Sequence, residues 1–215
     1  MNIQVVESVL KLNDDVAERN RAILRGKGIF TLNLIGGPGC GKTLLLERTL
    51  AALREKMRIA VIVGDLATAR DAERMGAFCP QVVQINTGKG CHLEAHQVRQ
   101  AMERLDLGEI DLLLIENVGN LVCPVGFDLG QDVKVGMFAT TEGPDKPAKY
   151  PQLVCAADLV LLNKMDLLKY VSFDLAQWHR DVARLNSRVR VVECAAYTND
   201  LGPWLGWLEE RVGKA

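Results

Sequence analysis

Residues 36–43 have the sequence Gly-Gly-Pro-Gly-Cys-Gly-Lys-Thr, which matches the pattern G-x-x-x-x-G-K-[ST] at every fixed position. The apolar run Ile29-Phe-Thr-Leu-Asn-Leu-Ile35 before it predicts a buried strand. The leucine-rich segment that begins near Lys42 predicts a helix. Because a phosphate-binding loop requires this strand–loop–helix order, the match is specific. We therefore expect an α/β fold of the P-loop NTPase type.

The residues of this loop have the chemistry that phosphate binding needs. Glycines let backbone N–H groups approach the phosphate oxygens where a Cβ would clash. The lysine is expected to neutralise the β- and γ-phosphates, and the threonine hydroxyl to bind Mg²⁺. The predicted phosphate-site residues are Gly36, Gly37, Pro38, Gly39, Cys40, Gly41, Lys42, Thr43 and Leu44. For Cys40 we favour a small side chain that points away from phosphate; the alternative is a thiol whose oxidation blocks the nucleotide, since helix N-termini lower thiol pKa values.

Apolar strands alternate with helices along the rest of the chain. Such alternation predicts one domain over residues 1–215, with a mostly parallel sheet, helices on both faces and a helical N-terminal extension of about residues 1–25. The further strands are expected at 59–63, 82–85, 112–115, 135–139, 159–162 and 189–192. The further helices are expected near 68–76, 92–105, 172–186 and 203–212, with 141–151 as one long connection.

The strand at 159–162 leads into Asn163-Lys-Met-Asp166, an N-K-x-D motif. The Asp166 carboxylate can accept two hydrogen bonds from the N1–H and N2–H₂ edge of guanine, a pair that adenine does not offer. Asn163 is expected to hold the loop, and the stem of Lys164 to pack over the base. After a P-loop this motif predicts GTP rather than ATP.

Two other strands are followed by acidic residues. Glu116 ends the strand at 112–115 and Asp65 follows the strand at 59–63, so both are candidates for catalysis, with Lys42, and for a magnesium site, with Thr43. A solvated acid at a strand end is the ordinary alternative for each. Gly119 lies where its N–H can sense a γ-phosphate.

Thiol and imidazole groups follow the strand at 82–85. Cys91 and His92 are adjacent, and Cys123 lies four residues beyond Gly119. These ligand types suit Ni²⁺ and Zn²⁺, in an open site or in one shared across a two-fold axis. A helix starting at residue 92 would favour the thiolate of Cys91. Ordinary buried cysteines are the alternative, and His96 is either a further ligand or a solvated helix residue.

The composition narrows the class of protein. The net charge of −1 over 215 residues argues against nucleic acid or a membrane surface as a partner. No signal peptide is evident, and no apolar run reaches the roughly 18 residues of a membrane span. The six cysteines lack the dense spacing of a disulfide scaffold, and Cys79, Cys155 and Cys194 are expected to be core or strand residues. These features predict a cytoplasmic protein.

Together, these motifs resemble the HypB family of hydrogenase nickel-incorporation proteins. The segments that carry the likeness are Gln84–Gly88 with Cys91-His92, Ile115–Pro124, Phe127–Gly130, Thr141–Pro151 and Asn163–Leu168. The resemblance implies a slow GTPase of the SIMIBI class that dimerises with GTP or metal. It also implies delivery of nickel to [NiFe]-hydrogenase large-subunit precursors alongside a HypA-like chaperone, with metal ligands on Cys91, His92 and Cys123.

Two departures from the family pattern are visible. Residues 1–25 contain neither Cys nor His, unlike relatives that store nickel there. The usual S-A-K base loop is Cys194-Ala-Ala-Tyr197, in which the backbone N–H groups of Ala195 and Ala196 are expected to face guanine O6.

Three alternatives to this function are open. A urease-type nickel GTPase would have Cys-Pro-His where this chain has Cys123-Pro124-Val125. A non-catalytic, nucleotide-gated metal carrier and a small-molecule kinase are the others. For assembly, the apolar residues Leu167, Leu168 and Val171 are either a dimer contact or ordinary core.

Overall fold

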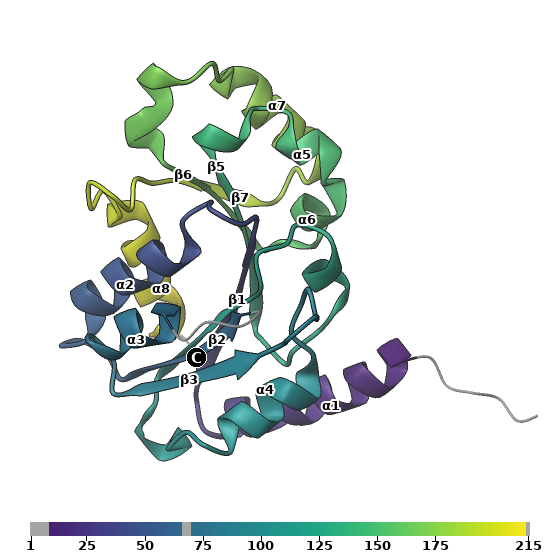
Figure 1. The fold of residues 1–215 in the computed structure, drawn as a ribbon, viewed down its shortest axis with the longest axis vertical. Coiled ribbons are helices and arrows are strands. Elements are labelled where there is room, and N and C mark those ends of the chain that lie inside the picture. Colours follow the sequence, from purple (N-terminus) through teal and green to yellow (C-terminus); the bar gives the residue numbers. More distant parts are fainter. Residues whose placement is uncertain (1–8, 66–69, 214–215) are drawn as a thin grey trace, which may run out of the picture.

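A computed structural model describes residues 9–65 and 70–213. Its centre is a seven-stranded sheet in the order β3-β2-β4-β1-β5-β6-β7, in which every neighbouring pair is parallel (Figure 1). The strands are β1 Phe30–Gly36, β2 Ile59–Asp65, β3 Gln81–Asn86, β4 Leu112–Glu116, β5 Val133–Ala139, β6 Leu159–Asn163 and β7 Arg190–Glu193. The predicted parallel α/β fold is therefore confirmed.

Helices cover both faces of the sheet (Figure 1). They are α1 Val9–Gly26, α2 Lys42–Leu53, α3 Arg70–Gly76, α4 Ala95–Met102, α5 Lys146–Lys149, α6 Pro151–Ala156, α7 Leu175–Leu185 and α8 Gly202–Val212. One core cluster joins β1, β2 and β4 to α2, α3 and α8. Two others join the opposite face to α1 and α4, and to α6 and α7. Strands β1, β2, β4 and β5 are buried throughout, apart from Asp65 at the end of β2 and Lys134, the second residue of β5, as expected of a covered parallel sheet.

Short 3₁₀ segments supplement the helices at Leu107–Glu109, Cys123–Gly126, Thr140–Glu142 and Met165–Tyr170. The stretch 141–151, predicted as one long connection, instead contains α5 and the start of α6. Each of these short helices has a proline in its first turn, where the missing N–H costs nothing. Helix α7 begins at residue 175 rather than 172, because the Asp174 side chain accepts a hydrogen bond from the backbone N–H of Gln177. Residues 68 and 69 of the helix predicted at 68–76, and residues 1–8 of the first, lie outside the described residues.

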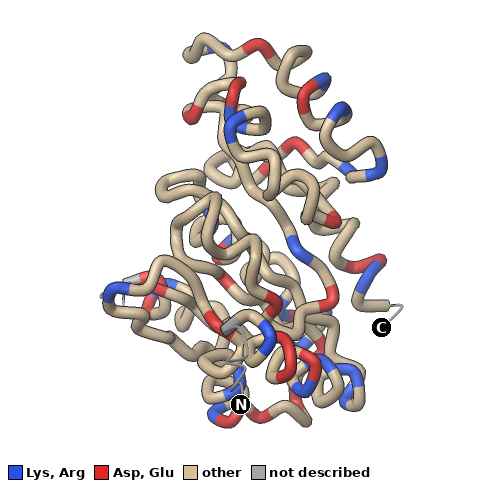
Figure 2. Tube along the Cα trace, turned by 90° about the vertical axis from the view of Figure 1, so that its right-hand side faces the viewer, with Lys and Arg blue, Asp and Glu red and all other residues tan. Residues whose placement is uncertain are grey.

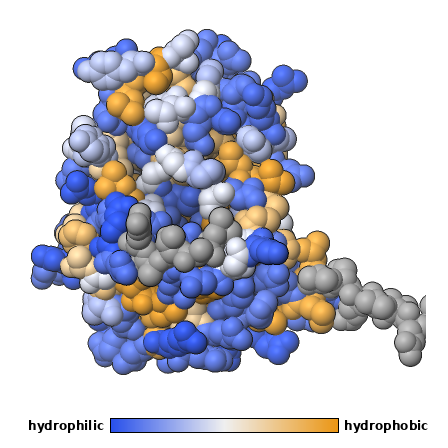
Figure 3. Space-filling view, in the orientation of Figure 1, coloured by the Kyte–Doolittle hydropathy of each residue, from blue (hydrophilic) through white to orange (hydrophobic). Residues whose placement is uncertain are grey.

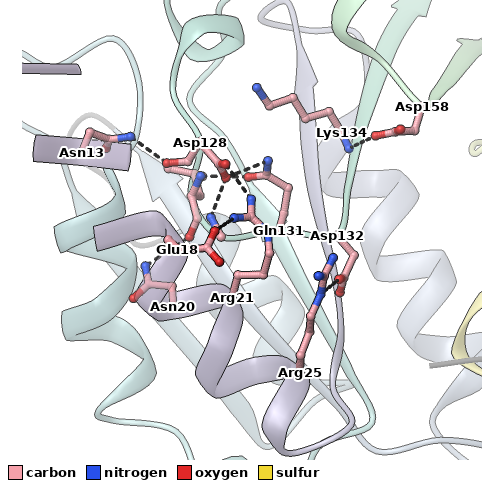
Figure 4. Close-up of polar contacts among 12 residues, drawn as sticks. Asn13, Glu18, Asn20, Arg21, Arg25, Asp128, Gln131, Asp132, Lys134 and Asp158 are labelled. Atoms are coloured by element: carbon pink, nitrogen blue, oxygen red, sulfur yellow. Dashed lines mark hydrogen bonds and ion pairs between the residues drawn. The ribbon is translucent and has the colours of Figure 1, made fainter. Parts of the chain in front are cut away.

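The N-terminal helix α1 is bonded to two other segments of the chain (Figure 4). Asn20 is fully buried, and its side-chain nitrogen donates to the carbonyl oxygens of Ala95 and Leu129. Arg21 forms a 2.6 Å ion pair with Asp128. A Cβ at Gly130 would lie 2.6 Å from that of Asn20, so the backbone of residues 128–130 packs directly on the helix. Helix α1 is therefore an integral part of the domain.

Charged residues of both signs are interspersed along the tube trace in Figure 2. The space-filling view in Figure 3, in the orientation of Figure 1, shows several separate apolar patches among hydrophilic residues. Within residues 9–65 and 70–213, no helix has the length and apolar character to cross a bilayer. Of the cysteines predicted to be core or strand residues, Cys79 and Cys194 are buried, but Cys155 is exposed on α6, so its prediction was wrong.

Candidate functional site

The loop 36–43 joins β1 to α2 at the carboxyl edge of the sheet. Gly39 and Gly41 have φ values of 76° and 102°, a left-handed conformation that side chains rarely adopt. The Lys42 ammonium donates to the carbonyl oxygens of Gly36 at 3.1 Å and Gly37 at 3.3 Å. Because α2 begins at Lys42, its N–H groups point into the same concave loop. The loop thus offers a fixed cation and backbone donors to an anion.

Cys40 within this loop is fully buried. Burial raises the pKa of its thiol to about 11, so the reactive thiolate is scarce at neutral pH. The structure therefore favours the inert interpretation of this cysteine over an oxidation-sensitive one.

Beside the loop, Thr43 Oγ1 donates a 2.9 Å hydrogen bond to Glu116 Oε1. The other carboxylate oxygen of Glu116 is buried and has no hydrogen-bond partner in the described part of the chain. Burial raises the pKa of Glu116 to about 7, a rise that Lys42 and the Thr43 hydroxyl oppose and that Asp71 and Asp65 reinforce. An unsatisfied carboxylate oxygen beside a hydroxyl is a donor set that suits Mg²⁺.

A pocket of about 340 Å³ opens over these groups. Its lining brings together Thr43, Asp65, Glu116 and Gly119, which the sequence singled out, with Asp71 and Arg74 of α3, which sequence reasoning missed. Arg74 is held by the buried Glu47 of α2 at 2.6 Å. In the sequence, Asp71 and Arg74 look like ordinary solvent-exposed charges on a surface helix. Only the packing of α3 on α2 places them at the pocket.

The backbone after β4 is bonded to the phosphate loop. A Cβ at Gly119 would lie 3.1 Å from the Cα of Pro38, so the two chains pack backbone to backbone. The N–H of Asn120 donates to the carbonyl oxygen of Gly36 at 3.1 Å. The Asn120 side chain donates to the carbonyl oxygen of Cys91 at 3.4 Å. One residue therefore connects the phosphate loop to the segment with the candidate metal ligands.

The base motif lies at the end of β6. Lys164 is in the left-handed region, with φ of 62°, and its carbonyl oxygen accepts a 2.7 Å hydrogen bond from Thr140 Oγ1. Asp166 Oδ1 is buried and has no hydrogen-bond partner among residues 9–65 and 70–213. A buried acceptor without a donor is the feature that a guanine edge would satisfy.

In the neighbouring loop at 194–197, both backbone N–H groups predicted to face guanine bind acceptors within the protein. The N–H of Ala195 donates to Asp200 O at 3.0 Å, and the N–H of Ala196 donates to Asn163 Oδ1 at 3.1 Å. Both groups already have acceptors within the protein, so hydrogen bonds to guanine O6, which stay a prediction, would have to replace or share these. The loop also supports Asn163.

The structure brings together the three candidate metal ligands. The ligand atoms of Cys91, His92 and Cys123 all lie within 4.8 Å of one another near the surface. Cys91 Sγ is 3.6 Å from His92 Nδ1, and the imidazole stacks on Phe127 with ring centroids 3.9 Å apart. Two thiols and one imidazole make an incomplete set for a transition ion, with further positions for water or a second chain. His96 lies outside this cluster.

The thiol electrostatics differ from the prediction. Helix α4 begins at Ala95, so Cys91 precedes the helix by several residues and receives no stabilisation from its N-terminus. A hydrogen bond with the Cys123 thiol, followed by burial, raises the pKa of Cys91. The Cys91 thiol therefore has to lose its proton when it binds an ion.

Asn117 is a further residue that sequence reasoning missed. Its side-chain oxygen accepts from the N–H of Leu93 at 3.1 Å and from that of Val118 at 3.0 Å. Its side-chain nitrogen donates to Asn33 at 3.2 Å. The residue directly after Glu116 therefore holds the segment with the candidate metal ligands against the end of β4. Its place between two site motifs was the only signal in the sequence.

Comparison with known proteins extends these observations. The family model described as CobW/HypB/UreG, nucleotide-binding domain, matches residues 30–193. The chain is 47% identical over 212 residues to the hydrogenase maturation factor HypB of Azotobacter vinelandii, an alignment that covers 98% of this chain and 70% of that protein. Two solved structures are also similar to it. HypB from Archaeoglobus fulgidus has a TM-score of 0.88 at 38% identity, covering 94% of this chain and 100% of that one. HypB from Helicobacter pylori in complex with nickel has a TM-score of 0.89 at 33% identity, covering 94% and 96%.

Proposed function

Since the chain belongs to the HypB hydrogenase maturation factors of the CobW/HypB/UreG family, we propose that it is a GTP-hydrolysing metallochaperone for nickel or zinc. In this proposal it helps to insert nickel into [NiFe]-hydrogenase, and metal release is coupled to GTP hydrolysis and dimerisation. The observation that carries the proposal is the path through Asn120, which is bonded to the phosphate loop at Gly36 and to the metal-ligand segment at Cys91.

The nucleotide part of the proposal is supported by Lys42, by Asp166 and by three residues that suit Mg²⁺. The Lys42 ammonium lies inside the loop, where the β- and γ-phosphates would replace its two carbonyl partners. Asp166 presents a buried acceptor to the guanine edge. Thr43, Asp65 and Glu116 would hold Mg²⁺, which supplies charge neutralisation when it is bound.

Hydrolysis consumes GTP and water and gives GDP and phosphate. In the proposed assignment Asp65 orients the attacking water, and Lys42 stabilises the charge that develops on the phosphoryl oxygens. Arg74 of α3 lines the pocket but is paired with the Glu47 carboxylate, which leaves it less able to stabilise the phosphoryl oxygens. We therefore expect slow turnover.

The metal is cargo. Cys91, His92 and Cys123 would hold it reversibly, because three ligands leave the coordination shell open. Mg·GTP would order the backbone at 116–123 and favour a homodimer that joins two such sets. Leu167, Leu168 and Val171 are partly exposed, which leaves apolar surface for that contact. A HypA-like nickel chaperone and the hydrogenase large-subunit precursor are the proposed partners, in the cytoplasm.

One titration tests the coupling. Wild-type protein and the Asn120→Ala variant would be loaded with GDP or with a non-hydrolysable GTP analogue. Nickel and zinc affinities are then measured, with mass followed by light scattering. We expect wild-type affinity for the ion to depend on the nucleotide, and Asn120→Ala to lose most of that dependence while retaining nucleotide binding. Equal ion affinities with both nucleotides in the wild type would contradict a GTP-coupled carrier.

Catalysis is tested separately. Single-turnover hydrolysis of GTP and ATP would be measured beside a Lys42→Ala control, with and without nickel. GTP turnover above the control supports an enzyme. Turnover no faster than the control would instead leave a metal carrier whose nucleotide only sets its conformation.

A further inference from the structure

The two ring nitrogens of His92 have different surroundings. Nδ1 faces the Cys91 thiol at 3.6 Å. Nε2 is enclosed by protein and has no hydrogen-bond partner in the part of the chain that the structure describes. The ring itself is held in place by stacking on Phe127. In this orientation Nδ1 is the nitrogen directed at the thiols, and Nε2 is a buried polar atom that lacks a partner.

A carboxylate lies beside that nitrogen. Glu94 Oε1 is 3.9 Å from His92 Nε2, slightly beyond hydrogen-bond length, and Glu94 Oε2 is 3.3 Å from His96 Nδ1. The Glu94 backbone is fixed independently, because its N–H donates to the Gln97 side chain at 2.9 Å. A small side-chain movement, with no change in the backbone, would therefore bring the carboxylate within hydrogen-bond distance of His92 Nε2.

The carboxylate beside His92 Nε2 has a known role in imidazole coordination chemistry. A neutral histidine that binds an ion through one nitrogen carries its proton on the other, and a carboxylate that accepts this proton fixes the tautomer and makes the ligand more basic. We propose that Glu94 is a positioning residue of the metal site, which accepts the Nε2–H of His92 when Nδ1 holds a nickel or zinc ion. The inference rests on the proposed function, because it assumes that Cys91, His92 and Cys123 bind the ion.

His96 has a distinct place in this proposal. It contacts the second oxygen of the same carboxylate, and its side chain is 56% exposed. In the apo protein it holds Glu94 away from His92 rather than serving as a ligand. Removal of His96 should therefore leave ion affinity unchanged or slightly higher.

The test is a competition titration of the full chain against a chromogenic chelator, with nickel alone and with zinc alone. Glu94→Ala should weaken ion affinity about 10- to 100-fold. Glu94→Gln retains an acceptor oxygen and should lose less. Glu94→Asn keeps a good residue for the start of α4 but is too short to reach His92, so it should resemble Glu94→Ala. Glu103→Ala, which removes an exposed acid on the same helical segment paired with Arg99, is the matched control and should bind as the wild type does.

Three further readouts separate this role from others. The thiolate-to-nickel absorption should persist in Glu94→Ala, since both sulfurs are intact, and GDP affinity should stay at the wild-type value. Thermal stability should fall only by the loss of the N-cap residue of α4, a loss that Glu94→Asn avoids. Wild-type ion affinity in Glu94→Ala would overturn the proposal, and so would an equal loss in His96→Ala, which would make His96 a ligand. Absence of ion binding in the wild type would instead refute the proposed function itself.

Discussion

The side-chain nitrogen of Asn163 donates a 2.9 Å hydrogen bond to the carbonyl oxygen of Cys40, joining the base motif to the phosphate loop across 123 residues of sequence. The same side chain accepts the N–H of Ala196 through its oxygen. A Cβ at Gly41 would lie 2.6 Å from the Asn163 nitrogen, so only glycine permits this contact. The two halves of the nucleotide site are thus held in register by one amide.

Asn163→Ala should therefore weaken the whole nucleotide site rather than the base contact alone. The change leaves a buried carbonyl and a buried N–H without partners, at a cost of about 1–3 kcal/mol. We expect GDP and GTP affinity to fall by about 10-fold or more, measured with a fluorescent nucleotide. Asn186→Ala is the control, because Asn186 also donates to a backbone carbonyl, that of Val154, but it joins the end of α7 to α6 rather than the two nucleotide motifs. An equal loss in both variants would show a general effect on stability.

Asp166→Ala should remove the preference for guanine. The buried Asp166 oxygen has no partner among the described residues, and the guanine edge supplies donors that adenine lacks. GTP affinity should fall by about 100-fold or more while ATP affinity changes little. Competition of ATP and GTP for the same site measures this ratio. A parallel loss for both nucleotides would mean that Asp166 does not contact the base.

Glu116→Gln should make the stability of the nucleotide-free protein less dependent on pH. Burial raises the pKa of Glu116 to about 7 from an ordinary 4.5. Because the folded pKa is the higher one, the stabilising contribution of this group is complete below about 4.5 and is lost as the pH rises through about 7. The glutamine variant should therefore be more stable than the wild type above that pH, by about 1 kcal/mol or more, and the two should converge toward acid.

Urea unfolding across this pH range is the measurement, with the exposed Glu109→Gln as the control. The same Glu116→Gln variant should bind Mg·GTP more weakly, since it lacks the carboxylate proposed for the cation. A variant that is less stable than the wild type above pH 7 would contradict the assignment of a buried carboxylate with a raised pKa.

Cys123→Ser should lower nickel affinity by about 100-fold or more, because a hydroxyl is a poor ligand for ions that bind thiolates. Cys155→Ser is the matched control: its thiol is exposed on α6, contacts Leu185 O and lies outside the cluster. Chelator competition checks both variants. Similar losses in the two would indicate that nickel binds thiols non-specifically.

The sequence predicted the parallel sheet and its central strands because short aliphatic runs such as those at 29–35 and 112–115 indicate strands that are buried on both faces. It also predicted the clusters at Lys42 and at Cys91, because parallel strands place their carboxyl ends at one edge. Contacts that depend on tertiary packing were out of reach. Arg74 and Asp71 reach the pocket only because α3 packs on α2, and the N–H groups of Ala195 and Ala196 are occupied by partners that a linear motif does not reveal.

Helix boundaries failed for a local reason. The apolar pattern before Ala95 continues into Cys91 and His92, so the periodicity gave no sign that the helix starts later. The short helices within 141–151 contain too few residues to show a period, and their prolines suggested a loop. Each error moved an element end without changing the sheet.

The anchoring of α1 has a mechanical consequence. Asn20 grips the peptide at Ala95, three residues after His92, and the peptide at Leu129, two residues after the ring on which His92 rests. The helix thus links the segment with Cys91 and His92 to the loop that follows Cys123. A force that displaces helix α1 would therefore change the distance between the Cys123 sulfur and the His92 imidazole, without contact to either the ion or the nucleotide.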